Sequence, residues 1–86
     1  MDVREAIPAR ISGEPAYVLD VSPNALRIGY QYFIEVGSEV DIAFEWDGQP
    51  VKLTGSVQWS RVERVGRGAS DRMFYEAGVN ILIRAA

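Results

Sequence analysis

Apolar and polar side chains alternate with a period of two along much of this chain. The stretches EVDIAFEW (residues 39–46) and VKLTGSVQW (residues 51–59) show it most clearly. Successive side chains of a β-strand point to opposite faces, so this period predicts two half-buried strands. Their buried faces are expected to hold Val40, Ile42, Phe44 and Trp46 in the first strand and Val51, Leu53, Gly55, Val57 and Trp59 in the second.

A tight hairpin is predicted to join these two strands. Asp47 and Gly48 lie between them. This dipeptide is favoured at the two central positions of a type I′ turn, because both positions require a positive φ. We therefore expect the two strands to pair antiparallel.

Four further strands are predicted from other alternating stretches. They are AIPARIS (6–12), PAYVLDV (15–21), ALRIGY (25–30) and FYEAGVNILI (74–83). The inward positions of the last two are expected to be Leu26, Ile28, Tyr30, Ala77, Val79, Ile81 and Ile83. The stretch SRVERVGRGASDRM (60–73) is expected to be a mobile loop, because it is irregular and contains two glycines.

Six short strands separated by Gly, Pro and Asp turns indicate an all-β fold. Closing the sheet removes its unpaired edges, and a chain of 86 residues is too short to cover the edges of two open sheets. We therefore expect residues 1–86 to form a single six-stranded antiparallel β-barrel with little or no helix.

The composition narrows the chemistry that this barrel can perform. Cysteine and histidine are both absent, which removes disulfides, thiol nucleophiles, histidine-based triads and most zinc sites. Only carboxylates, hydroxyls and arginines remain, so we expect no enzyme activity, no metal site and no cofactor. No run of about 18 apolar residues and no signal-like leader is present, so we expect a cytoplasmic protein without membrane insertion.

The net charge is −3 and is unevenly distributed along the chain. Residues 1–50 contain three arginines against nine acids, whereas residues 51–86 contain six basic residues against three acids. The overall sign disfavours binding to a nucleic-acid polymer. The asymmetry suits a local anion site or a contact with a protein partner.

A polar turn separates two of the predicted strands in LDVSPNALRI (residues 19–28). One interpretation is structural: side chains of an Asp-x-Ser turn bond their own backbone, and Asn24 adopts the left-handed conformation usually taken by glycine. The other is that Asp20 and Ser22 contact a ligand. Arg27, on the same outer surface as Asp20, would then contact a phosphate or simply pair with Asp20.

The order of these features resembles that of a PilZ domain, a bacterial β-barrel module known for binding cyclic di-GMP. LDVSPNALRI is similar to the family's D/N-x-S-x-x-G turn followed by an apolar strand. IEVGSEVDIAF, LTGSVQW and YEAGVNIL resemble three of its strands, in the same order. The resemblance extends over nearly the whole chain.

The resemblance implies a nucleotide site built from two motifs. In the family, an R-x-x-x-R element binds phosphates and guanine edges, as a guanidinium fork is suited to do, and the D/N-x-S-x-x-G turn binds guanine. The candidate nucleotide-binding residues of this chain are Arg4, Arg10, Asp20, Ser22, Asn24 and Arg27.

This chain departs from both motifs. Five residues separate Arg4 from Arg10 instead of three, and Ala25 replaces the glycine of the turn. A residue other than glycine at positive φ costs on the order of 1 kcal/mol, and its methyl group restricts the approach of a ligand. These departures imply weakened nucleotide binding.

Two further groups of charged residues are interpreted as solvated surface. Arg61, Arg64, Arg67 and Arg72 form either an anion patch or a loop in which Glu63 and Asp71 are partial partners. Glu35, Glu39, Asp41, Glu45 and Asp47 alternate outward along strands, so we expect an exposed face and no catalytic carboxylate pair.

Tyr30, Tyr32 and Phe33 lie close together in GYQYF. Alternation can bury only some of them, so at least one aromatic ring should remain exposed. An exposed ring beside a polar rim suits contact with a protein partner, and it also fits base stacking or a cap on the barrel end.

The function expected from the resemblance is a non-catalytic PilZ-type regulatory domain in bacterial cyclic di-GMP signalling, which controls motility or surface behaviour through protein–protein contacts. Nucleotide binding is expected to be weakened or lost. The alternative is a working cyclic di-GMP receptor that uses the Asp20-x-Ser22 turn and nearby arginines. Cyclic di-GMP would then be a ligand and not a cofactor.

Overall fold

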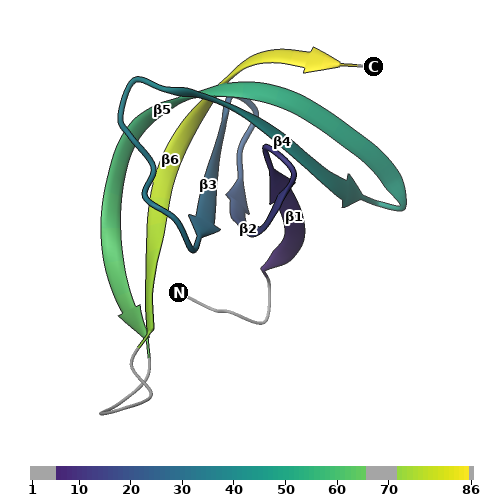
Figure 1. Cartoon of the computed structure of the whole chain (residues 1–86). Coiled ribbons are helices and arrows are strands. Elements are labelled where there is room, and N and C mark those ends of the chain that lie inside the picture. Colours follow the sequence, from purple (N-terminus) through teal and green to yellow (C-terminus); the bar gives the residue numbers. More distant parts are fainter. Residues whose placement is uncertain (1–5, 66–71, 86) are drawn as a thin grey trace.

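Six antiparallel strands form a closed barrel in the computed structural model, which describes residues 6–65 and 72–85 (Figure 1). The strands are β1 (Ile7–Ile11), β2 (Glu14–Val21), β3 (Ala25–Tyr30), β4 (Glu39–Trp46), β5 (Gln49–Val65) and β6 (Arg72–Ala85). Their order around the barrel is β1-β2-β3-β6-β5-β4, and β1 pairs with β4 to close it. The predicted small all-β barrel is confirmed. Within these two ranges no helix is long and apolar enough to cross a membrane.

The core fills the barrel with side chains from alternate positions of every strand, as closure of a small barrel requires. Its buried members are Ile11, Ala16, Val18, Leu26, Ile28, Ile34, Ile42, Phe44, Leu53, Val57, Ala77 and Val79. Burying each large aliphatic side chain contributes about 1.5–3 kcal/mol. The alternation read from the sequence therefore places most of the core correctly; the side chain of Ile83 lies outside the described part of the chain.

The hairpin between β4 and β5 has the predicted geometry. Asp47 and Gly48 have φ values of 53° and 75°, and Trp46 pairs with Gln49 on either side of them. Both central residues thus occupy the left-handed region that a type I′ turn requires.

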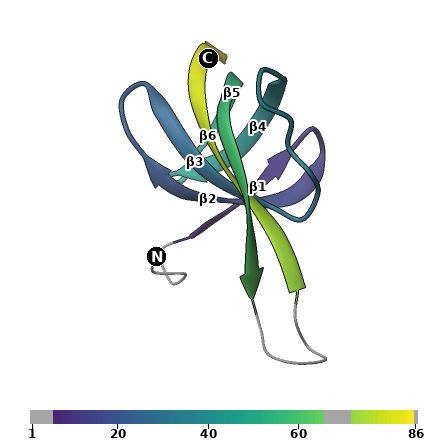
Figure 2. The same ribbon diagram turned by 90° about the vertical axis from the view of Figure 1, so that its left-hand side faces the viewer.

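The strands β5 and β6 continue well beyond the barrel, so the predicted loop over residues 60–73 is wrong at both ends. Residues 60–65 and 72–77 pair with each other, and Val62 lies opposite Tyr75. Pairs of β-branched and aromatic residues stabilise antiparallel strands, which favours this extension. Figure 2 shows the resulting two-stranded extension, which we call the arm (residues 60–65 and 72–76).

Three irregularities in strand pairing change which side chains face outward. The register shifts between Val18 and Asp20, between Thr54 and Gly55, and between Val57 and Trp59. An extra residue in one strand reverses the alternation that follows it. Trp59, predicted to be buried, therefore lies on the outer surface. Trp46 is also exposed, at the end of β4, so the prediction that it is buried is wrong.

Candidate functional site

A row of four residues crosses the outer face of the barrel from β2 to β5. Asp20 on β2 pairs with Arg27 on β3, Arg27 pairs with Gly78 on β6, and Gly78 pairs with Trp59 on β5. Facing residues in neighbouring antiparallel strands have their Cβ positions about 5 Å apart. The register thus brings an acid, a base and an indole from distant parts of the sequence onto one surface.

A second row lies two residues along the same strands. Glu76 on β6 pairs with Arg61 on β5 and with Gly29 on β3. Side-chain atoms of Leu19 and Phe74 lie 3.4 and 3.6 Å from the place that a Cβ on Gly29 would occupy. These two apolar side chains therefore cover the sheet beside Glu76. Glu76 itself is only 1% exposed although it projects from the outer face.

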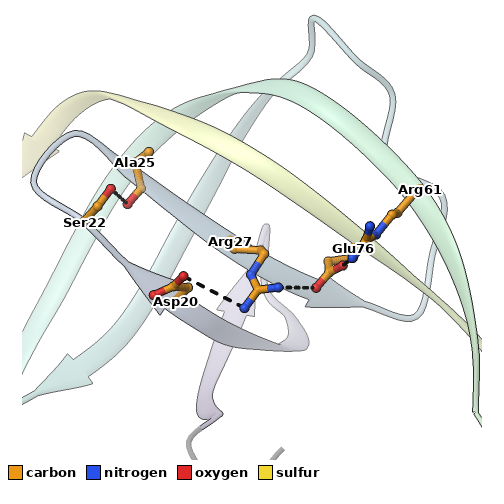
Figure 3. A network of polar contacts seen from close by, with 6 residues as sticks. All are labelled: Asp20, Ser22, Ala25, Arg27, Arg61 and Glu76. Carbon is orange, nitrogen blue, oxygen red and sulfur yellow. Dashed lines mark hydrogen bonds and ion pairs between the residues drawn. The ribbon is translucent and has the colours of Figure 1, made fainter. Parts of the chain in front are cut away.

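Two guanidinium groups neutralise this buried carboxylate (Figure 3). Arg27 Nη1 donates to Glu76 Oε1 at 3.1 Å, and Arg61 Nε donates to Oε2 at 2.8 Å. Arg61 Nη2 donates to the same Oε2. Both carboxylate oxygens thus have charge-assisted partners, which a buried charge requires. The hydrogen bonds from Arg61 to Glu76, with the carboxylate's negative charge, raise the pKa of this arginine above its ordinary value.

Two further acids extend the network into solvent. Asp20 Oδ2 lies 3.9 Å from Arg27 Nη2, and its side chain is 70% exposed. Glu63 Oε1 lies 2.9 Å from Arg61 Nε. Exposed ion pairs contribute little, so Glu76 provides most of the attraction in what we call the Glu76 network (Asp20, Arg27, Arg61, Glu63 and Glu76). Arg27 Nε is buried and has no hydrogen-bond acceptor among the residues described.

The Trp59 indole lies directly against Gly78. A Cβ on Gly78 would overlap the Nε1 edge of that ring, so a side chain at position 78 would displace the indole. Arg61 Cζ lies 5.6 Å from the centroid of the same ring, within the range of a cation–π contact. The Trp59 indole and the Glu76 carboxylate therefore both contact the Arg61 guanidinium and fix its position.

A shallow depression of about 330 Å³ lies beside the network. Asp20, Ser22, Arg27, Trp59 and Asn80 contribute to its lining. This volume is at the lower end of the range for small-molecule sites. The structure thus brings three of the predicted nucleotide-binding residues, Asp20, Ser22 and Arg27, to one depression.

The turn that carries Ser22 is stabilised by its own hydrogen bonds. Ser22 N and Ser22 Oγ donate to the Ala25 carbonyl at 2.9 and 3.1 Å, and Ile81 N donates to the Asn24 carbonyl at 2.9 Å. Neither Asn24 nor Ala25 has a positive φ. The prediction that Asn24 replaces a left-handed glycine is therefore wrong, because Ala25 is already the first extended residue of β3.

Among the described residues, Arg10 and Asn24, the other two predicted to bind nucleotide, do not line this depression. Arg10 lies on β1, where its Nη1 donates to the Gly13 carbonyl at 3.0 Å, and it borders a different depression beside Asp41. Strand β1 and strand β3 are separated by β2 in the barrel, so Arg10 cannot form a fork with Arg27. Arg4 lies outside the described residues.

The predicted arginine patch is only partly described. Arg61 belongs to β5 and not to a loop, and its predicted pairing with Glu63 is confirmed. Arg67 and Asp71, with the side chains of Arg64 and Arg72, lie outside the described part. The outward acids are exposed as predicted: Glu35, Glu39, Asp41, Glu45 and Asp47. Within residues 6–65 and 72–85, no three potential ligand side chains come together to hold a metal ion.

Of the three aromatic residues in GYQYF, one is packed and two are exposed. Tyr30 packs against the core, whereas Tyr32 and Phe33 are exposed, as predicted for at least one ring. Burial raises the pKa of Tyr30, with smaller contributions from the charge of Glu14 and from Tyr32. The tyrosine hydroxyl at position 30 therefore lies in an environment that disfavours negative charge.

Comparisons with protein-family models, with curated proteins and with solved structures found no match. The PilZ resemblance thus stays a prediction from sequence motifs, and the description of the site rests on its geometry.

Proposed function

We propose that this chain is a non-catalytic regulatory domain of the PilZ type, which acts in bacterial cyclic di-GMP signalling mainly through contacts with a protein partner. The motif order and the small closed barrel support the proposal. In this proposal the domain affects motility or surface behaviour, and it binds the nucleotide weakly or not at all.

The observation that carries the proposal is the engagement of Arg27 by Glu76. Within residues 6–65 and 72–85, Arg27 is the one predicted nucleotide-binding arginine that lies at the depression, and its Nη1 is 3.1 Å from a buried carboxylate oxygen. A ligand phosphate that bonds to this nitrogen would have to replace that carboxylate. Separating a buried carboxylate from its partner costs about 3–5 kcal/mol, which corresponds to roughly 10²–10⁴-fold in affinity.

The other groups of the depression support the same conclusion. Ser22 Oγ already donates to the Ala25 carbonyl, and Arg10 lies elsewhere on the barrel. Within the described part of the chain, the Glu76 network contains three acids and two arginines, so it does not attract an anion. A dianionic nucleotide is a poor ligand for such a surface.

One specific observation favours the alternative function. Asp20 is 70% exposed at the edge of the depression and is only loosely paired with Arg27. An exposed carboxylate can accept hydrogen bonds from the N–H groups of guanine, as in a cyclic di-GMP receptor.

Calorimetric titration with cyclic di-GMP separates the two functions. We expect no micromolar binding to the wild type, and tighter binding to Glu76→Gln, because that substitution weakens the charge that holds Arg27. Micromolar binding by the wild type that Asp20→Ala abolishes would establish the receptor function instead. Circular dichroism of each variant verifies that the barrel is intact.

A further inference from the structure

A second surface lies at the end of the barrel where the arm begins. Tyr30 on β3 pairs with Tyr75 on β6, and Tyr75 pairs with Val62 on β5. The rings of Tyr30 and Tyr32 meet edge to face with centroids 5.3 Å apart, and those of Phe33 and Tyr75 do so at 5.8 Å. We call these five residues the aromatic surface.

Three members of the aromatic surface are largely open to solvent. Phe33 is 69% exposed, Tyr32 51% and Val62 49%. Isolated exposed apolar residues are common on proteins, but a contiguous group on a rigid support is typical of a protein-binding surface. The two ring contacts and the strand pairs join these three residues through Tyr30 and Tyr75. They therefore form one group and not three isolated side chains.

The segment that carries Phe33 is held in place on its C-terminal side. Ile34 is buried in the core, and Gly37 N donates to the Val57 carbonyl at 2.8 Å while Val57 N donates to the Ser38 carbonyl at 2.9 Å. Phe33 therefore cannot turn into the barrel, because the neighbouring residue already occupies that position. A ring that is fixed before binding loses little conformational entropy when a partner covers it.

Two acids lie near the residues of the aromatic surface. Glu14 is close enough to raise the pKa of Tyr30 through its charge, and Glu35 is the one charged residue of residues 30–38. Over the whole chain, twelve acids stand against nine basic residues, and two of those nine, Arg27 and Arg61, are bound to Glu76. Complementary potential thus favours a positively charged partner.

We propose that the aromatic surface docks a segment of a partner protein in which lysine or arginine residues flank an apolar anchor side chain. This inference rests on the proposed function, to which it adds the place of contact and the chemistry of the partner. The anchor packs on Phe33, Tyr32 and Val62. The flanking cations interact with Glu14 and Glu35 at the rim.

Selection of random 16-residue peptides displayed on phage, with the purified chain as the target, tests this directly. We expect the selected peptides to combine an aromatic or large aliphatic residue with neighbouring lysine or arginine. Phe33→Ser should weaken their binding by about tenfold or more, as loss of a central anchor contact does. Trp46→Ser is the matched control, since Trp46 is an exposed aromatic on β4; it should leave binding unchanged.

The charge component is tested separately, with a variant that leaves the apolar residues intact. Glu35 is exposed, and Glu35→Lys should weaken the binding of the selected peptides several-fold. It should also reduce the salt dependence of that binding. Selected peptides without basic residues, or with equal affinity for Phe33→Ser and the wild type, would overturn the inference. If their binding instead depends on Trp46 or Trp59, the result supports a protein-contact function but refutes docking at the aromatic surface. No selected peptide at all would count against both.

Discussion

The Glu76 network and the aromatic surface both include residues of β3, β5 and β6, but their side chains are used in opposite ways. In the network, Arg27 and Arg61 are both used to neutralise one buried carboxylate. On the aromatic surface, Tyr30 and Tyr75 support Phe33 and Tyr32, which remain exposed. The buried carboxylate of the first region is neutralised within the chain, whereas the exposed rings of the second still have apolar surface that a partner could bury. This difference is why we propose the aromatic surface as the place of contact with a partner.

The largest expected effect comes from removing the charge at the centre of the network. Glu76→Gln leaves two guanidinium groups without their carboxylate, and we expect it to lower the free energy of unfolding by about 2–3 kcal/mol. This figure is below the range for fully buried pairs because Arg61 is more than half exposed. Urea denaturation followed by circular dichroism measures it.

Glu63→Gln is the matched control for that substitution. Glu63 contacts the same Arg61 at 2.9 Å but is much less buried than Glu76. An exposed pair contributes about 0–1 kcal/mol, so this variant should unfold close to the wild type. Equal losses in the two variants would contradict the central role of Glu76.

The next largest loss of stability is expected where the Trp59 indole packs against the sheet. Gly78→Ala puts a methyl group where that indole lies, and overpacking of this kind costs about 1–3 kcal/mol. At Gly29 a Cβ would make an ordinary contact with Leu19 at 3.4 Å, so Gly29→Ala should cost less. Urea denaturation of both variants measures the difference. In a Trp59→Ala background the cost of Gly78→Ala should largely disappear, and persistence of the cost would show that the indole is not its cause.

A smaller effect is expected at the aromatic surface. Phe33→Ser removes an exposed ring and its edge contact with Tyr75, so stability should fall by about 1 kcal/mol or less. Thermal denaturation measures this change. A loss as large as that of Glu76→Gln would mean that Phe33 is part of the core and not a docking residue.

The smallest effect is the pH dependence that arises at Tyr30. Its pKa is raised in the folded chain, so the folded state retains this proton more strongly than the unfolded state. The resulting stability is fully present below the ordinary pKa of about 10 and is lost as the pH rises through the folded value. Ultraviolet titration of the tyrosines should show a late-titrating component that is absent in Tyr30→Phe. Glu14→Gln should shift that component to lower pH, and an unchanged titration would place Glu14 away from the aromatic surface.

Much of the barrel could be predicted from the chain itself. The period of two identified the strands, and Asp47 with Gly48 identified a turn with two positive φ values, as the structure has it. These signals are local, because they depend on the direction of successive side chains and on the conformations that a residue tolerates. The same signals also placed Asp20 and Arg27 on one outer surface.

The candidate site could not be predicted in the same way. The alternation places Glu76 on the outer face, which is correct, but Glu76 is 1% exposed there and is contacted by arginines of two other strands. Trp59 was expected inside, and the irregular pairing after Val57 turns it outward. Both outcomes depend on which residues of other strands lie opposite. The outward glycine at position 78 beside a tryptophan-bearing strand was the one sequence signal that could have indicated the indole's position.

The sequence by itself determined the strands, the tight hairpin, the apolar interior and the absence of cysteine and histidine chemistry. Only the tertiary structure decided that Arg27 and Arg61 share one buried carboxylate, and that Phe33 and Tyr32 stand exposed on a support of Tyr30 and Tyr75. The physical reason is that the two kinds of feature depend on residues at different separations along the sequence. Alternation and turn conformation are set by neighbouring residues, whereas the charge and exposure of a side chain are set by the register of strands that are distant in the sequence.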